Sequence, residues 1–172
     1  IGAGVSALVV GGTTGEAATL SNRERYALYE FAKDRIGDRA KLILGVGTND
    51  TAIAIRHARR SCEIGCDALL AVTPYYNKGT EGGIVKHYLQ IAEASTVPVL
   101  LYNVPSRTGC NLLPSSVAAL ADHPNIVAIK EACGNISQIA ELAALVGDRL
   151  DIYSGNDDQI VPVMSLGGQG VI

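Results

Sequence analysis

Short apolar runs recur along the chain, and their starts are 19 to 34 residues apart. Seven runs follow this rhythm, at residues 7–10, 41–45, 68–72, 97–102, 125–130, 151–155 and 170–172. Each is followed by polar or glycine-rich residues and then by a helical stretch, which is typical of repeated βα units. Strands that are apolar almost throughout indicate a parallel sheet covered on both faces. The sequence therefore predicts an α/β fold.

Helix-end signals lie between these runs. Ser21 and Glu24 form a capping-box pattern, and Gly37 is a typical stop. By the same signals, further helices are expected from Asn49 or Asp50 to Gly65, over residues 112–125 up to Pro124, and from about Asn135 to Gly147.

Seven strands fit two architectures. A doubly wound sheet accepts seven, whereas a (β/α)8 TIM barrel needs eight strands and usually about 250 residues. The chain has 172 residues, begins without Met and stops inside an apolar run, so both ends have the pattern of a cut element. We therefore expect one domain, residues 1–172, that forms an incomplete TIM barrel with strands 2 to 8. The first strand and the C-terminal helical region would be missing. The doubly wound sheet is the alternative.

Composition excludes several classes of protein. The chain is 48% hydrophobic and 18% charged, with a net charge of −3 and a pI of about 5.6. It is therefore globular, and neither a nucleic acid nor a membrane surface is expected as a partner. No apolar run approaches the roughly 18 residues of a membrane span, and the N-terminal stretch lacks the basic region of a signal peptide. The spacing of the cysteines matches neither a disulfide framework nor a zinc site, so reduced cytosolic thiols are expected at Cys62, Cys66, Cys110 and Cys133.

Ligands of both architectures bind at the carboxyl ends of the strands. Those ends read GGTTGE, GVGTND, TPYYN, YNVPSRTG, KEACGN and SGNDD. They offer threonine, tyrosine, arginine and lysine side chains but no nucleophile–His–acid set. An acidic pair can bind Mg²⁺, but helix capping is the expected role of Asp157 and Asp158. Surface or structural roles are expected for His57, His87 and His123.

Lys130 directly follows the apolar run 126–129. An ordinary lysine is neutral at pH 7 in only about one molecule in 10³, but full burial lowers its pKa by up to ~3–5 units. A neutral buried amine can attack a ketone and form a Schiff base. The alternative is a structural lysine that reaches solvent or pairs with Glu131. Because successive strand residues point to opposite faces, Glu131 should point away from Lys130.

Other strand ends supply groups with two possible roles. GGTTGE, with Thr13 and Thr14, could hold a carboxylate or a phosphate, or could be an ordinary βα turn. Tyr75 and Tyr76 fit either proton relay or interface packing. Arg107 offers a fork for a carboxylate, or is a solvated surface charge.

GTTGE, TPYYNK, YNVPSRTG, IKEACGN and SGND, in this order and spacing, closely resemble the dihydrodipicolinate synthase family. That family belongs to the pyruvate-dependent class I aldolases, with N-acetylneuraminate lyase. The similarity covers essentially the whole chain, and YNVPSRTG with IKEA is its specific part. The resemblance implies a cytoplasmic TIM barrel, commonly a homotetramer. Its implied reaction condenses pyruvate with L-aspartate 4-semialdehyde to 4-hydroxy-tetrahydrodipicolinate in lysine (diaminopimelate) biosynthesis.

The resemblance also implies residue roles. Lys130 would form a Schiff base with pyruvate, without a metal or another cofactor. Tyr102 would assist imine formation, and Thr14 would link it to Tyr76 from a neighbouring subunit. The implied substrate-binding residues are Thr13 and Thr14 for the pyruvate carboxylate, Arg107 for the semialdehyde carboxylate, and Gly155 and Ile172 through their backbone.

Two other functions remain open. One is a sister pyruvate aldolase that acts on a keto-deoxy sugar acid, against which Arg107 argues. The other is a non-catalytic anion-binding barrel, against which the intact set of site residues argues. Because an unclosed barrel exposes strand edges, we expect that residues 1–172 alone would not be a stable, active enzyme.

Lysine feedback is the property in which the chain departs from the family pattern. Asn49 and Tyr75 of the family's lysine site are present, but histidines common in sensitive members are replaced by Asn22 and Arg25. Ile53 replaces a glutamate that meets the ammonium group of lysine, and a buried unpaired ammonium is costly. We predict weak or no inhibition of the full-length protein by lysine in an activity assay. Potent inhibition at micromolar lysine would contradict this.

Overall fold

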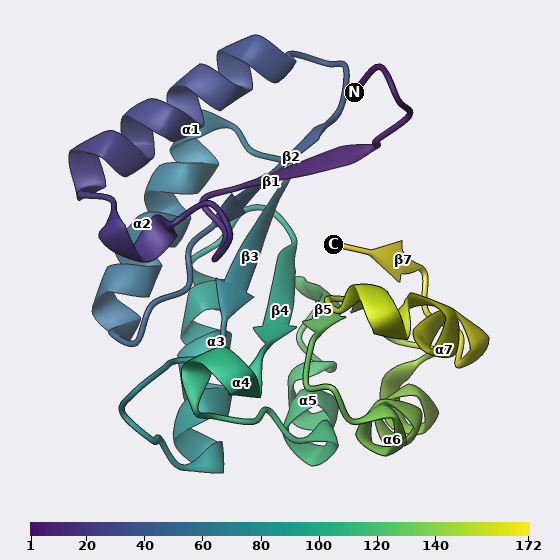
Figure 1. The fold of residues 1–172 in the computed structure, drawn as a ribbon. Helices are drawn as coiled ribbons and strands as arrows, with labels where there is room; N and C mark the ends of the chain where they lie inside the picture. The colour runs from purple at the N-terminus through teal and green to yellow at the C-terminus, as the bar shows by residue number, and fades with distance from the viewer.

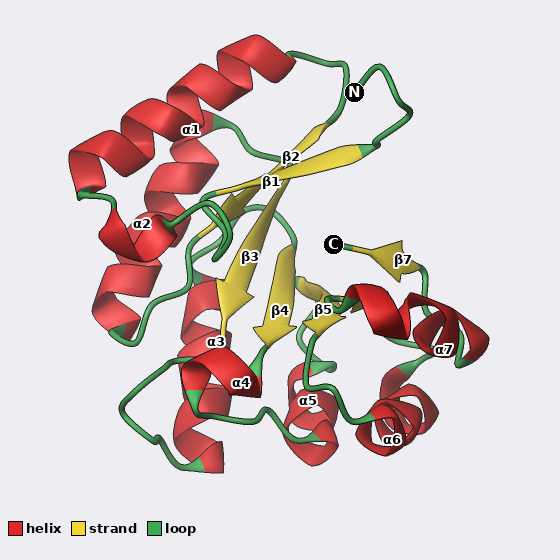
Figure 2. Ribbon diagram, in the orientation of Figure 1, coloured by secondary structure: helices red, strands yellow, loops and turns green.

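Seven strands form one parallel sheet, and their order in the sheet is their order in the chain (Figures 1 and 2). The computed structural model describes all residues 1–172. The strands are β1 (Ala7–Val10), β2 (Lys41–Gly45), β3 (Ala68–Val72), β4 (Val99–Asn103), β5 (Ile126–Glu131), β6 (Asp151–Ser154) and β7 (Gly170–Val171). A doubly wound sheet reverses its strand order at a switch point, and this sheet does not. The incomplete TIM barrel is therefore confirmed, and the doubly wound alternative is wrong.

Helices follow the strands and surround the outside of the curved sheet (Figure 1). They are α1 (Asn22–Ile36), α2 (Thr51–Ile64), α3 (Glu81–Glu93), α4 (Pro105–Thr108), α5 (Pro114–Leu120), α6 (Ile136–Val146) and α7 (Ile160–Ser165). Two short 3₁₀ turns, η1 (Ala17–Thr19) and η2 (Asp157–Gln159), complete the chain.

The sheet has a different core on each face. A cluster of 28 buried residues combines strand and helix side chains, so it fills the space between the sheet and the helices. A second cluster contains no helix residue and therefore lies on the inner face of the curve. Its eight members are Ile43, Ala68, Leu70, Leu100, Tyr102, Val104, Ala128 and Ala132.

The predicted helix ends are largely confirmed. The Ser21 hydroxyl accepts from the Glu24 N–H at 3.3 Å, and the Glu24 carboxylate accepts from the Ser21 N–H at 2.9 Å, which is the full capping box. Asp50 rather than Asn49 caps α2. The helix α5 ends at Leu120, earlier than predicted.

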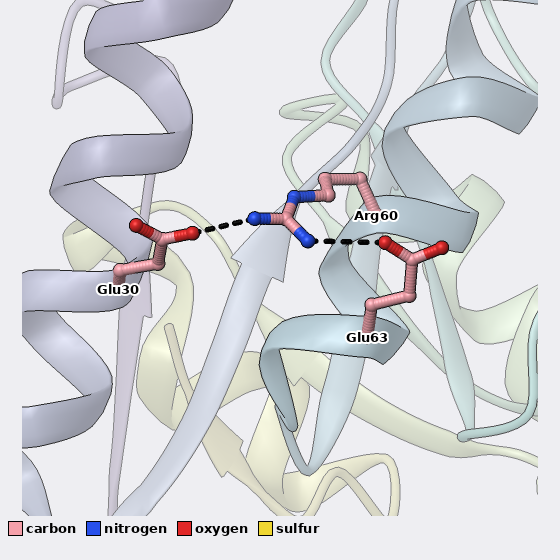
Figure 3. A network of polar contacts seen from close by, with 3 residues as sticks. All are labelled: Glu30, Arg60 and Glu63. Carbon is pink, nitrogen blue, oxygen red and sulfur yellow. Dashed lines mark hydrogen bonds and ion pairs between the residues drawn. The ribbon is translucent and has the colours of Figure 1, made fainter.

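An ion-pair network joins α1 to α2 (Figure 3). The Arg60 guanidinium lies 2.6 Å from the Glu30 carboxylate and 3.1 Å from that of Glu63. All three side chains are exposed, and exposed pairs are worth about 0–1 kcal/mol. The apolar core, rather than this network, holds the two helices on the sheet.

Gly45 at the end of β2 is required by close packing, because a Cβ there would overlap the Gly11 carbonyl. We predict that Gly45→Ala in the full-length protein lowers the free energy of unfolding by about 1–3 kcal/mol in denaturant titrations. Gly82→Ala, at a helical position with open space around it, is the matched control and should stabilise by up to about 1 kcal/mol. A Gly45→Ala protein as stable as the parent would refute the packing argument.

Candidate active site

Lys130 lies near the carboxyl end of β5 and is the register partner of Tyr102 in β4 and of Tyr153 in β6. Its side chain is half-buried, and its Nζ lies 4.5 Å from the centroid of the Tyr102 ring. The face of an aromatic ring attracts a cation at this distance. The amine and the phenol predicted for the site are therefore neighbours.

Glu131 points to the opposite face of the sheet, as strand alternation predicts. Its side chain is only 1% exposed. The carboxylate accepts hydrogen bonds from the Asn103 amide at 3.1 and 3.2 Å and from the Cys133 N–H at 2.8 Å. None of the four ion pairs in the structure involves Lys130. The structural alternative in which Lys130 pairs with Glu131 is therefore wrong.

Burial and a neighbouring charge act on Lys130 in the opposite sense to the aromatic ring. Burial lowers the pKa of Lys130 below its ordinary value, and the Arg107 charge lowers it further. Both effects disfavour the ammonium form, so a larger fraction of Lys130 is neutral at neutral pH. Since the neutral amine is the nucleophile, the site suits attack on a carbonyl group.

A cavity of about 380 Å³ opens beside Tyr102 at the carboxyl ends of the strands. Thr13, Tyr102 and Arg107 line it, as predicted for site residues. Lys130 does not line this cavity, but its Nζ lies against the ring of Tyr102, which does. Burial raises the pKa of Tyr102, an effect that the Thr13 side chain and the Arg107 charge partly offset. The phenol is therefore protonated at neutral pH and can donate its proton.

The turn after β1 brings Thr13 to the cavity. Gly11 has a φ of 70°, and a Cβ there would overlap the Tyr29 hydroxyl. That hydroxyl donates to the Gly45 carbonyl at 2.5 Å and accepts from Arg25 at 3.1 Å. A second Arg25 N–H donates to the backbone carbonyl of η1 at residue 17. These bonds tie α1 to β2 and to η1, which directly follows the turn.

The same turn can bind an anion. The backbone N–H groups of Thr13 and Thr14 donate to no acceptor within the protein. Successive free N–H groups in a turn form a concave binding site for a carboxylate or a phosphate.

The two threonines of the turn are placed differently. Both residues are exposed, but Thr13 lines the cavity and lowers the pKa of the Tyr102 phenol, whereas Thr14 does not line the cavity. The predicted hydroxyl link from Tyr102 through Thr14 therefore has no contact that supports it. Thr13 is the threonine that shares the cavity with Tyr102, and the link through Thr14 stays a prediction.

Tyr76 lies apart from Tyr102, at the surface. Its side chain is 87% exposed, and its φ of 72° is unusual for a residue other than glycine. With Arg107 it lines a second, more open hollow of about 580 Å³. An exposed tyrosine held by a strained backbone suits contact with another molecule. Its role across a subunit interface stays a prediction.

Gly155 and Ile172 do not line the cavity. A Cβ at Gly155 would come within 2.9 Å of Lys130 Cε, so the glycine leaves room for the lysine side chain. The Ile172 N–H donates to the Ser154 carbonyl at 3.0 Å, and Ile172 packs on the inner cluster. Neither residue has a tested role in substrate binding.

Arg25 and His57 also line the cavity, although neither was predicted to be a site residue. Arg25 is 8% exposed and His57 is 4% exposed. Burial, with the charge of Arg25, lowers the pKa of His57 to about 4, so its ring is neutral and bonds the Tyr26 hydroxyl at 2.8 Å. Arg25 and Tyr29 are four residues apart on one helix, a spacing that would have allowed a shared face to be predicted.

Three further findings concern classes of site. No group of three or more His, Cys, Asp or Glu side chains is placed to hold a metal ion. The four cysteines are free. No helix combines the length and the apolar character that a membrane crossing requires.

The fold and the site define a class: a parallel (β/α) barrel that carries a strand-end lysine against a tyrosine ring, beside a glycine-rich turn with free N–H groups. The chain belongs to the dihydrodipicolinate synthetase family, whose model matches residues 1–172.

Relatives and solved structures agree with this. The chain is 50% identical over 169 residues to the 4-hydroxy-tetrahydrodipicolinate synthase of Clostridium novyi (strain NT), covering 98% of this chain and 57% of the relative. It is 52% identical over 166 residues to that of Caldicellulosiruptor saccharolyticus, covering 96% and 56%. The chloride-inhibited dihydrodipicolinate synthase of Acinetobacter baumannii, complexed with pyruvate, matches with a TM-score of 0.95 at 41% identity, covering 98% and 58%. The chain thus spans little more than half the length of these relatives.

Removal of the Arg107 charge should raise the pKa of Lys130, because a nearby cation disfavours a second one. We predict that Arg107→Gln moves the pH profile of Lys130 carbamylation by cyanate to higher pH, as measured by peptide mass mapping. Lys78→Gln removes an exposed charge from the same open hollow and should leave the profile unchanged. Identical profiles for Arg107→Gln and the parent would contradict the prediction.

Proposed function

We propose that the full-length protein is a 4-hydroxy-tetrahydrodipicolinate synthase. It would condense pyruvate with L-aspartate 4-semialdehyde in the cytoplasm, as a step of lysine (diaminopimelate) biosynthesis. The observation that carries the proposal is Lys130: a half-buried amine with a lowered pKa, no carboxylate partner, and a phenol ring 4.5 Å away. Membership of the family and the relatives of 50% and 52% identity support it.

The amine supplies the covalent chemistry. Neutral Nζ attacks C2 of pyruvate to form a carbinolamine, which loses water to give a protonated imine. The imine withdraws electrons, so C3 loses a proton and becomes an enamine carbon. That carbon attacks the aldehyde of the second substrate, and the aldehyde oxygen gains a proton. The amino group of the product then displaces Lys130 and closes the ring. No cofactor beyond this Schiff base is required.

Tyr102 is the proposed proton-transfer group. Its raised pKa keeps the phenol protonated, and its ring lies against the amine. It can therefore protonate the carbinolamine hydroxyl as water leaves and recover a proton afterwards. Thr13, which lines the same cavity, could orient the phenol, as could the expected Thr14.

Two anion sites would hold the substrates. The free N–H groups of Thr13 and Thr14 suit the pyruvate carboxylate. The Arg107 fork at the cavity suits the carboxylate of the semialdehyde, which favours this aldehyde over a sugar-acid aldehyde. The pyruvate complex of the Acinetobacter baumannii relative supports pyruvate as the first substrate.

Tyr76 is proposed to act in a neighbouring subunit of a homotetramer. Its 87% exposed side chain and its place beside Arg107 at the open hollow support contact with a second chain. Tyr75 lines both the cavity and this hollow, so an interface here would border the site.

Borohydride trapping tests the proposal directly. The full-length protein is incubated with pyruvate and borohydride, and the modified peptide is mapped by mass. Label is expected on Lys130, and Lys130→Arg should abolish it and lower kcat by at least about 10³-fold. Lys86→Arg, on an exposed face of α3, is the control and should behave as the parent. An unlabelled Lys130 with retained activity would end the proposal, and product assays with each aldehyde would decide the second substrate.

A further inference from the structure

On the helix-facing side of the sheet, Asn103 and Glu131 are register partners at the ends of β4 and β5. They are 0% and 1% exposed. The Asn103 amide donates to both Glu131 carboxylate oxygens, at 3.1 and 3.2 Å, and the Cys133 N–H donates to one of them at 2.8 Å. The preceding register pair, Tyr102 and Lys130, faces the inner side of the barrel. The polar pair therefore lies directly behind the amine and the phenol of the site.

The polar pair is joined to the elements around it. The Asn103 side-chain oxygen accepts from the Leu112 N–H at 2.9 Å, and its amide donates to the Asn111 side chain at 2.9 Å. Asn111 and Gln138 exchange two hydrogen bonds, at 2.8 and 3.1 Å. The network thus ties the ends of β4 and β5 to the segment before α5 and to the first turn of α6.

Stability alone does not account for this network. Glu131 has no cationic partner, and burial raises the pKa of its carboxyl group. Buried polar groups of this kind are often no more stabilising than apolar residues of similar volume, and their best-attested role is to specify register.

The pairing of β4 with β5 is one in which the register has to be specified. Its register shifts near the start: Val99 pairs with Ile126, but Leu100 pairs with Ala128, so Val127 is passed over. A slip of one residue turns every side chain of a strand to the other face of the sheet. Because the ladder is irregular at its start, the register of the later pairs must be set by a specific contact further along. Asn103 and Glu131 are the last pair of that ladder.

We propose that Glu131, through Asn103, is a positioning residue that pins β4 and β5 in the register that sets the Tyr102 ring against Lys130 Nζ. The inference rests on the proposed function, in which these two groups form and protonate the imine. A misplacement of about 1 Å can cost roughly 10²-fold in rate. The N–H groups proposed to bind pyruvate lie on the turn after β1, and β2 and β3 separate that strand from β4 and β5 in the sheet. Loss of the pair should therefore lower kcat and leave KM for pyruvate nearly unchanged.

The test uses three variants of the full-length protein. Glu131→Gln keeps the size of the side chain but sets an N–H group against the Asn103 amide. The double variant Glu131→Gln with Asn103→Asp exchanges donor and acceptor and restores a bond between the two positions. Glu141→Gln makes the same chemical change on an exposed face of α6 and is the matched control.

Three quantities are measured: the single-turnover rate of borohydride-trapped imine, kcat and KM for pyruvate, and the pH profile of Lys130 carbamylation by cyanate. Glu131→Gln should slow imine formation and lower kcat by about 10- to 10²-fold, with KM changed less than about twofold. The pH profile of Lys130 carbamylation should move to higher pH, because the Lys130 side chain is no longer held in its buried position. The double variant should recover part of the rate, because Asn103→Asp still loses the bond that the amide donates to Asn111, and Glu141→Gln should match the parent.

A Glu131→Gln protein with the parent's imine rate and cyanate profile would overturn the inference. So would one that only melts at lower temperature while its kcat is unchanged. If Glu131→Gln does not fold, Glu131→Asp is used instead. Its side chain is shorter by one methylene, and the same decreases in the rate of imine formation and in kcat are expected. Failure of the parent to trap pyruvate would remove the proposed function, and the cyanate profile, which needs no substrate, would still decide the positioning role.

Discussion

The register between β4 and β5 is the constraint on which the rest of the site depends. Two neighbouring strands that run parallel bring one pair of side chains to the inner face and the next pair to the helix-facing side. Tyr102 and Lys130 form the inner pair, and Asn103 and Glu131 form the outer one. The sheet thus separates the buried Glu131 carboxylate from the amine and the phenol, which lie together on the inner face. Because of this separation, Lys130 has no counter-ion. Burial can therefore lower the pKa of its amine without an opposing effect from a nearby carboxylate.

The electrostatic character of the site follows from what surrounds that pair. Arg107 lies at the cavity and lowers the pKa of both Lys130 and Tyr102, while burial acts in opposite directions on the two groups. Arg25, also at the cavity, is tied to the Tyr29 hydroxyl and to η1 instead of to a carboxylate. Cationic groups and free N–H groups therefore predominate where anionic substrates would bind.

Much of the fold could be predicted because local signals and long-range packing agree. The rhythm of apolar runs predicted seven parallel strands, and Ser21, Gly37 and Gly65 marked helix ends that the structure confirms. Strand bounds moved by one or two residues, since ladder pairing with neighbours decides where a strand begins. The early end of α5 was missed because the chain turns at Ala121, before Pro124 forces it to.

The sequence by itself determined which chemical groups stand at the strand ends, and through its motifs the family to which the chain belongs. Only the tertiary structure decided how those groups meet. It placed Thr13 rather than Thr14 at the cavity that Tyr102 lines, buried Arg25 and His57 there, and paired Glu131 with Asn103 instead of Lys130. The physical reason is that each of these choices depends on contacts between segments distant in the chain. A turn residue's orientation, a helix residue's burial and a strand's register are all set by the neighbouring elements, and a local pattern does not contain them.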